Sequence, residues 1–150
     1  MKGVVYRSNE VQFELGARMP GARQIHSDDA LVTWQNDVAG TTVAVNARCG
    51  LDGDDVPLEA LIHHLLIQFT DREEVVRRPF ILDDRAALRV DEMANLDGVR
   101  RYLSMIVLKK DGCVYDFIHI DGQLAFDGIA PEVETSRRNF LLMVEGFHTL

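Results

Sequence analysis

The stretch that decides the fold is 94–120, which reads ANLDGVRRYLSMIVLKKDGCVYDFIHI. It contains two Asp-Gly pairs, Asp97-Gly98 and Asp111-Gly112, and each pair lies between runs of apolar residues. Asp-Gly favours the positive backbone angles of tight hairpin turns. Two such turns in succession predict a three-stranded antiparallel meander over residues 86–121.

The middle and last strands of this meander are apolar on both of their faces. In the middle strand one face carries Leu103, Met105 and Val107, and the other carries Tyr102, Ile106 and Leu108. A strand that is apolar on both sides needs cover on both sides. The pattern therefore predicts a sheet that lies between two covering layers.

Two amphipathic segments can supply this cover. The first, at 57–70, repeats apolar residues at helical spacing: Leu58, Leu61, Ile62, Leu65, Leu66 and Phe69. The second opens at Pro131 with acidic residues in its first turn and continues through Val133, Phe140, Val144 and Phe147. We expect an α+β fold in which an antiparallel meander is covered by two helices, a three-layer α/β/α sandwich.

The rest of the chain adds shorter elements to a single domain over residues 1–150. We expect one or two strands within 3–15, a surface loop at 16–29, a strand pair at 31–35 and 41–47, an acidic turn at 51–55, and a strand broken near Pro79. Such a chain is long enough to fold without a metal ion or a disulfide bond.

Charge and hydropathy exclude some classes of partner. Asp and Glu number 24 against 16 Lys and Arg, which gives a net charge of -8. This balance argues against binding to nucleic acids and to anionic membranes through basic residues. No apolar run reaches the 18 or so residues of a membrane span, and the first ten residues lack a signal core. We expect a cytoplasmic protein that does not insert into membranes; the alternative is a periplasmic accessory domain whose signal has been removed.

The order of these elements resembles that of the PsbP-like superfamily. The resemblance covers residues 3–147: a short opening hairpin, a strand pair around Trp34 and 43–47, a helix at 57–70, the Asp-Gly meander, and a closing helix. This superfamily includes PsbP itself, the Mog-type Ran-binding proteins, and the DcrB-type and Eag-type bacterial proteins.

The resemblance implies a three-layer fold that mostly binds other proteins and has no shared active site. Among its members, this chain looks most like the cytosolic Eag-type proteins, which are chaperones of type VI secretion effectors. The implied role is that of a chaperone or adaptor for a secreted effector.

The histidines offer the strongest case for an enzyme. His26 stands close to Asp28-Asp29, and His119 and Asp121 alternate onto one face of a strand. Two ligands on a strand do not complete a metal site, and the sequence supplies no third one. A metal-dependent or small-ligand enzyme built on His26, His119 and nearby carboxylates is our second hypothesis; the leading hypothesis requires no cofactor.

The two cysteines, Cys49 and Cys113, are too far apart in sequence for their distance in space to be inferred. We interpret them as two structural thiols, with a disulfide in an exported protein as the less favoured alternative. We prefer a structural to a catalytic role for Cys113, because a reactive cysteine requires a cationic or helix-terminal setting.

Our leading hypothesis is a non-enzymatic module that binds an apolar helix or strand of another protein. Because two helices cannot cover a long sheet completely, we expect an exposed patch that includes Trp34, Tyr102 and Phe126. Arg100 is a further candidate, since arginine is enriched at interfaces. Arg77-Arg78 and Arg100-Arg101 can also pair with Asp83, Asp84 or Asp91 across strands, and for each doublet taken singly we prefer this structural interpretation. A homodimer is compatible with the sequence.

Overall fold

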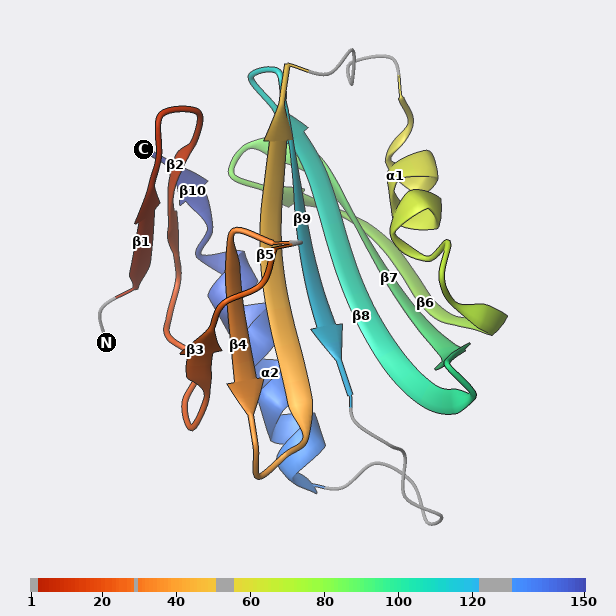
Figure 1. Cartoon of the computed structure of the whole chain (residues 1–150). Coiled ribbons are helices and arrows are strands. Elements are labelled where there is room, and N and C mark those ends of the chain that lie inside the picture. Colours follow the sequence, from red (N-terminus) through yellow and green to blue (C-terminus); the bar gives the residue numbers. More distant parts are fainter. Residues whose placement is uncertain (1–2, 29, 51–55, 122–130) are drawn as a thin grey trace.

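The computed structural model describes residues 3–28, 30–50, 56–121 and 131–150. Phe126 and the acidic turn expected at 51–55 lie outside these ranges. Within them the chain forms β1 (Val4–Arg7), β2 (Gln12–Leu15), β3 (Arg23–Ile25), β4 (Val32–Asn36), β5 (Thr41–Cys49), α1 (Leu58–Leu65), β6 (Thr70–Leu82), β7 (Arg85–Leu96), β8 (Val99–Lys110), β9 (Cys113–Ile120), α2 (Pro131–Glu145) and β10 (His148–Thr149) (Figure 1).

Most of the strands form one antiparallel sheet in the order β3-β4-β5-β9-β8-β7-β6. After β5 the chain passes through α1 to the far edge of the sheet, and then returns strand by strand until β9 pairs with β5. A second sheet, β1-β2-β10, joins the opening hairpin to the last strand. The predicted meander is confirmed as the β7-β8-β9 part of the large sheet.

The hairpin turns depend on aspartate in left-handed backbone conformations. Asp97 and Asp111 have φ angles of 50° and 52°, and the glycine after each also has a positive φ. Both predicted Asp-Gly turns are therefore confirmed. A third turn, between β6 and β7, uses Asp83 and Asp84 at φ 50° and 61°. Aspartate tolerates this region better than most residues do, so a glycine is not required there.

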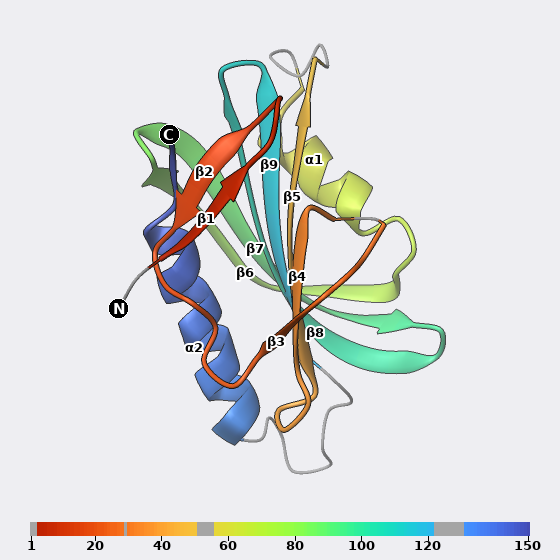
Figure 2. The same cartoon turned by 60° about the vertical axis from the view of Figure 1, so that its left-hand side comes forward.

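The large sheet is covered on both faces, as the two-sided apolar pattern predicts. On one face α2 and the small sheet pack against Trp34, Val45, Ile106 and Phe117. On the other face α1 packs against Val90, Leu103, Met105 and Val107. The two helices thus lie on opposite sides of the sheet (Figure 2), which confirms the three-layer α+β architecture.

Three local predictions were wrong. Helix α1 ends at Leu65 rather than at residue 70, and the turn that follows it places Leu66 in the core. Strand β6 runs through Pro79 without a break, since a proline is tolerated on an edge strand. The expected loop at 16–29 contains β3 and the buried Met19.

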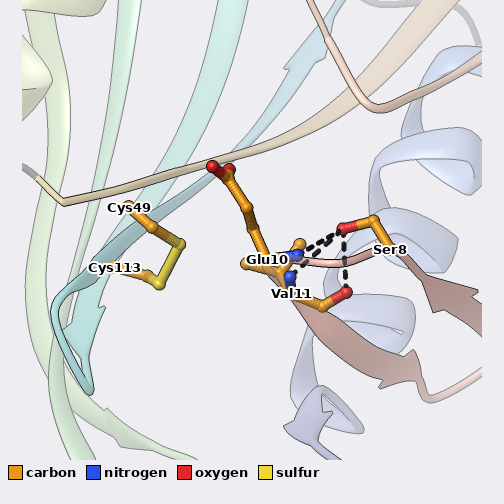
Figure 3. The surroundings of a disulfide bond; sticks show 5 residues. All are labelled: Ser8, Glu10, Val11, Cys49 and Cys113. Carbon is orange, nitrogen blue, oxygen red and sulfur yellow. Dashed lines mark hydrogen bonds between the residues drawn. A yellow bond between two sulfur atoms is a disulfide. The ribbon is translucent and has the colours of Figure 1, made fainter.

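The cysteines form a disulfide, with an S–S distance of 2.06 Å. Our preferred interpretation, two separate thiols, was therefore wrong. Cys49 ends β5 and Cys113 begins β9, and the antiparallel register places them directly opposite each other. Figure 3 shows the bridge together with the Ser8–Val11 turn of the opening hairpin, where the Ser8 hydroxyl accepts hydrogen bonds from the Glu10 and Val11 amides. Both cysteines pack with Val11 in the same core cluster.

Candidate functional site

The face of the sheet under α1 is only partly covered. Helix α1 has 8 residues, whereas β6 has 13 and β7 has 12. Where α1 begins, a groove of about 610 Å³ remains between the helix and the ends of β6 and β7. Its lining is mainly apolar: Pro57, Leu58, Pro79, Ile81, Ala86 and Leu88, with Glu59 beside them. We call this feature the α1 groove.

Strand β6 forms one wall of the groove and is also an outer edge of the large sheet. Two of its apolar side chains are exposed, Val75 by 49% and Ile81 by 70%. A long edge strand with exposed apolar residues is a template on which another strand can pair. The groove and the edge therefore together offer an apolar surface and unpaired backbone groups.

Charged side chains connect this edge to the neighbouring elements. The Arg77 guanidinium donates hydrogen bonds to Glu74 at 2.7 Å and to Glu59 of α1 at 3.0 Å. Arg72 binds the buried Glu92 of β7 through two hydrogen bonds, which raise the pKa of the guanidinium. Arginine side chains therefore link β6 both to the helix and to the next strand.

Arg100 supports the beginning of the same edge. Its guanidinium donates to the Asp71 carbonyl at 2.6 Å and to the Asn95 side chain at 3.2 Å, and it lies 3.3 Å from a Glu73 oxygen. Of the four residues predicted to contact a partner, Arg100 is thus placed beside the β6 edge. The cross-strand partners proposed for the arginine doublets were wrong, because Asp83 pairs with Lys110 and Asp91 pairs with Arg89.

The predicted aromatic patch is not exposed. Trp34 is 7% accessible and packs in the core beneath α2. Tyr102 is 9% accessible, and its hydroxyl donates to Asp91 at 2.8 Å. The expectation that these rings face solvent was therefore wrong, because the α2 layer covers them. Phe126 lies outside the described residues, and a partner contact by any of the four stays a prediction.

A buried polar cluster lies on the α2 face, at the opposite side of the sheet from the groove. The Ser136 hydroxyl of α2 is 2.8 Å from Nε2 of His119 and 2.7 Å from the Thr41 hydroxyl. Nδ1 of His119 lies 3.3 Å from Asp121, which accepts a hydrogen bond from Arg137 at 2.7 Å. The three side chains thus have the arrangement of a catalytic triad, in which a serine is the nucleophile, a histidine is the base and an aspartate orients the histidine.

This cluster does not present a nucleophile to a substrate. Ser136 is 3% accessible, His119 is fully buried, and Asp121 is 1% accessible. The Ser136 hydroxyl is already hydrogen-bonded to two side chains, and a buried polar group needs such partners. We interpret the cluster as a polar connection that fixes α2 to β5 and β9.

The second histidine of the enzyme hypothesis is in a different setting. His26 and Asp28 lie 3.1 Å apart, but their side chains are 89% and 94% exposed. His119, by contrast, is buried under α2. Among the residues that the structure describes, no group of three or more His, Cys, Asp or Glu side chains could hold a metal ion.

Burial changes the pKa of two side chains near the centre of the sheet. It raises the pKa of Asp116 to about 6, although the charge of Arg48 opposes the rise. Burial also raises the pKa of Tyr102 to about 12, with a further contribution from the hydrogen bond to Asp91. Because Tyr115 and Phe117 point toward α2, Asp116 between them points to the α1 face.

Sequence reasoning predicted incomplete cover but placed the exposed patch on the wrong face. The groove depends on how α1 is placed over the sheet and on the position of β6 at the outer edge, and both are set by contacts between distant segments. One signal was available: six of residues 71–78 are charged, and Val75 and Val76 are the two apolar residues among them.

No protein-family model matches the sequence, and no curated protein matches it. Among solved structures, the chain is similar to cyanobacterial PsbP (CyanoP) from Synechocystis, with a TM-score of 0.63 and 10% identity over 99% of this chain and 93% of that chain. It is also similar to LpqN, involved in cell envelope biogenesis of Mycobacterium tuberculosis, with a TM-score of 0.62 and 11% identity over 99% and 90%. The chain therefore has a PsbP-like fold. At these identities the likeness concerns the fold alone.

Neither described helix has the length and hydrophobicity needed to cross a lipid bilayer.

Proposed function

We propose that this chain is a non-enzymatic protein-binding module, and that an apolar segment of its partner lies in the α1 groove. The observation that carries the proposal is the groove itself, whose apolar lining is left uncovered by the short helix. Exposed apolar surface of this kind is typical of sites that bind other proteins. The exposed Ile81 side chain at its rim would be buried by such a partner.

The disulfide supports a site of action in an oxidising compartment. Such bonds persist in exported proteins and are rare in the cytosol. We therefore favour an exported accessory module over the cytosolic effector chaperone that the sequence suggested. The similar fold of LpqN, a protein described as involved in cell envelope biogenesis, agrees with this choice. A chaperone or adaptor role for an exported partner is the finer form of the proposal.

A photo-crosslinking amino acid at Ala86 tests the binding site. Ala86 lines the groove from β7, one strand away from the edge. The matched control is Leu142, which is exposed by 53% on α2. We expect a covalent adduct with one partner protein from position 86 and none from position 142.

Affinity for the partner found in this way provides the quantitative test. Ala86→Glu places a charge in the apolar groove and should lower the affinity for the purified partner about tenfold or more. Leu142→Glu should leave it unchanged. Equal adducts from the two positions, or an unchanged affinity of the Ala86→Glu variant, would contradict the proposal.

The compartment is tested separately by trapping thiols in intact cells with a bulky maleimide. If the protein acts in an oxidising compartment, Cys49 and Cys113 are protected until a reductant is added. Two cysteines that react at once would show that the bond is absent in the cell.

A further inference from the structure

The β6 edge carries a charge pattern that is complementary to itself. Residues 73–78 read Glu-Glu-Val-Val-Arg-Arg, with two acids, two valines and two arginines in order. When this segment is laid antiparallel to an identical copy about a two-fold axis between Val75 and Val76, each glutamate lies opposite an arginine. Glu74 faces Arg77 of the other copy, and Glu73 faces its Arg78.

Such pairing requires that opposite residues lie on the same face of the sheet. In a regular strand Glu74 and Arg77 would point to opposite faces, because they are three residues apart. Here the register of β6 against β7 shifts between Glu74 and Val76, which adds a residue and reverses the alternation. The 2.7 Å bond between Arg77 and Glu74 shows that the two side chains share a face.

The second pair lies together on the other face. Glu73 reaches Arg100, and Arg78 lines a small cavity with Phe80, Arg89 and Leu141 of α2. No ion pair involves Arg78 among residues 3–28, 30–50, 56–121 and 131–150, so its charge is available to an acid on another chain. The shift in register is thus what makes both sets of opposite charges meet.

The edge is open to a second chain. Among the residues that the structure describes, β6 pairs with β7 on one side and with no strand on the other. Helix α1 packs mainly over β7 and β8 and contacts β6 through the side chains of Arg72 and Arg77. Val75 at the centre of the segment is 49% exposed. Glu73, Glu74 and Arg77 have side chains that are 69%, 43% and 41% exposed, so their present contacts are in water and are readily exchanged.

We propose that the β6 edge binds a second copy of this chain, so that two large sheets join into one across a two-fold axis. This inference extends the proposed function by naming the partner of the edge, and it leaves the groove to another protein. Because an axis of this kind is perpendicular to the sheet, both copies would present their α1 grooves on the same side. The dimer would then hold two apolar segments of a partner at once.

Charge reversal tests the register on the full chain, with sedimentation velocity over a concentration series. One variant carries Glu73→Arg and Glu74→Arg, and the other carries Arg77→Glu and Arg78→Glu. We expect the unaltered chain to dimerise and each variant to do so about tenfold more weakly or worse, because like charges now face each other. An equimolar mixture of the variants should form a one-to-one heterodimer.

The mixture also answers the objection that a variant fails to fold, since damaged chains would not recover by mixing. Glu132→Arg with Glu134→Arg, an equal change of charge on exposed positions of α2, serves as the control and should leave dimerisation unchanged. A monomeric wild-type chain at every concentration, or variants that do not associate when mixed, would overturn the inference.

This outcome is distinguishable from failure of the proposed function. The adduct from position 86 reports the groove, so a monomeric chain that still forms it refutes the dimer alone. A dimer that forms no adduct with another protein refutes the groove as the binding site.

Discussion

The two faces of the large sheet are built from the same strands, yet they are covered very differently. The α2 face lies under a 15-residue helix and a second sheet. It encloses a cluster of aromatic rings, in which the ring centroid of Phe147 is 5.1 Å from those of Tyr115 and Phe117. The α1 face lies under 8 helical residues and retains the groove. The closed face therefore holds most of the tight packing, whereas the open face leaves apolar surface uncovered, and this is the surface at which we propose that a partner binds.

The largest expected effect comes from Phe147→Ala on the closed face. Removing a fully packed ring leaves a cavity, and we expect the free energy of unfolding to fall by about 3–5 kcal/mol. Ile81→Ala on the open face should change it by less than about 0.5 kcal/mol, since this side chain is mostly exposed. Urea denaturation measures both; similar losses would show that the two faces are equally packed.

Removal of the disulfide should have the next largest effect. Cys49 and Cys113 are 64 residues apart, and a closed loop of this length predicts a loss of about 4 kcal/mol in the chain-entropy model, with about 2–4 kcal/mol typical of measured bridges. The change is Cys49→Ala with Cys113→Ala, followed by urea denaturation. Added reductant should lower the free energy of unfolding of the unaltered chain and leave that of this variant unchanged. If reductant destabilises both proteins, its effect does not come from the Cys49–Cys113 bond.

Asp116→Asn tests the cost of a buried charge on the open face. The carboxyl has a folded pKa of about 6, above its usual value of 3.8. Between these values the unfolded chain releases the proton first, so the native protein becomes less stable as the pH rises. The variant lacks this cost and should be more stable by about 2–3 kcal/mol near pH 8.

The pH dependence of that difference is the decisive measurement. At about pH 3 and below, the Asp116 carboxyl is largely protonated in both the folded and the unfolded chain, and the difference should disappear. Glu132→Gln, at an exposed position on α2, should show no such trend. A constant difference across the pH range would mean that Asp116 does not titrate as proposed.

The smallest expected effect comes from Tyr102→Phe on the closed face. The substitution removes a hydrogen bond to the buried Asp91, which keeps its ion pair with Arg89. We expect a loss of about 1–2 kcal/mol in thermal or urea unfolding. Tyr6→Phe is a control, because no hydrogen bond of the Tyr6 hydroxyl is found among the described residues. Equal losses of stability from Tyr102→Phe and Tyr6→Phe would show that the hydrogen bond between Tyr102 and Asp91 does not stabilise the fold.

Local signals predicted the parts of the fold that depend on neighbouring residues. The Asp97-Gly98 and Asp111-Gly112 turns set two hairpins, and the alternation through Leu103 and Ile106 correctly predicted two covering layers. The turn at Asp83-Asp84 was missed, because two aspartates do not mark a hairpin as strongly as Asp-Gly does.

The rest depends on contacts between distant segments. The disulfide follows from the pairing of β5 with β9, which brings Cys49 and Cys113 into register although no local pattern connects them. Trp34 and Tyr102 were expected at the surface, but α2 covers the face on which they lie. The edge position of β6 results from the crossing of the chain through α1, and no spacing within 70–82 reveals it.

The Cys49–Cys113 bridge has a consequence for proteolysis. It encloses residues 50–112, the segment that contains α1, β6, β7 and β8. A single peptide-bond cleavage anywhere in this segment leaves both fragments covalently attached in one molecule. The groove and the edge strand can therefore survive nicking in an environment rich in proteases, and reduction is required to release the pieces.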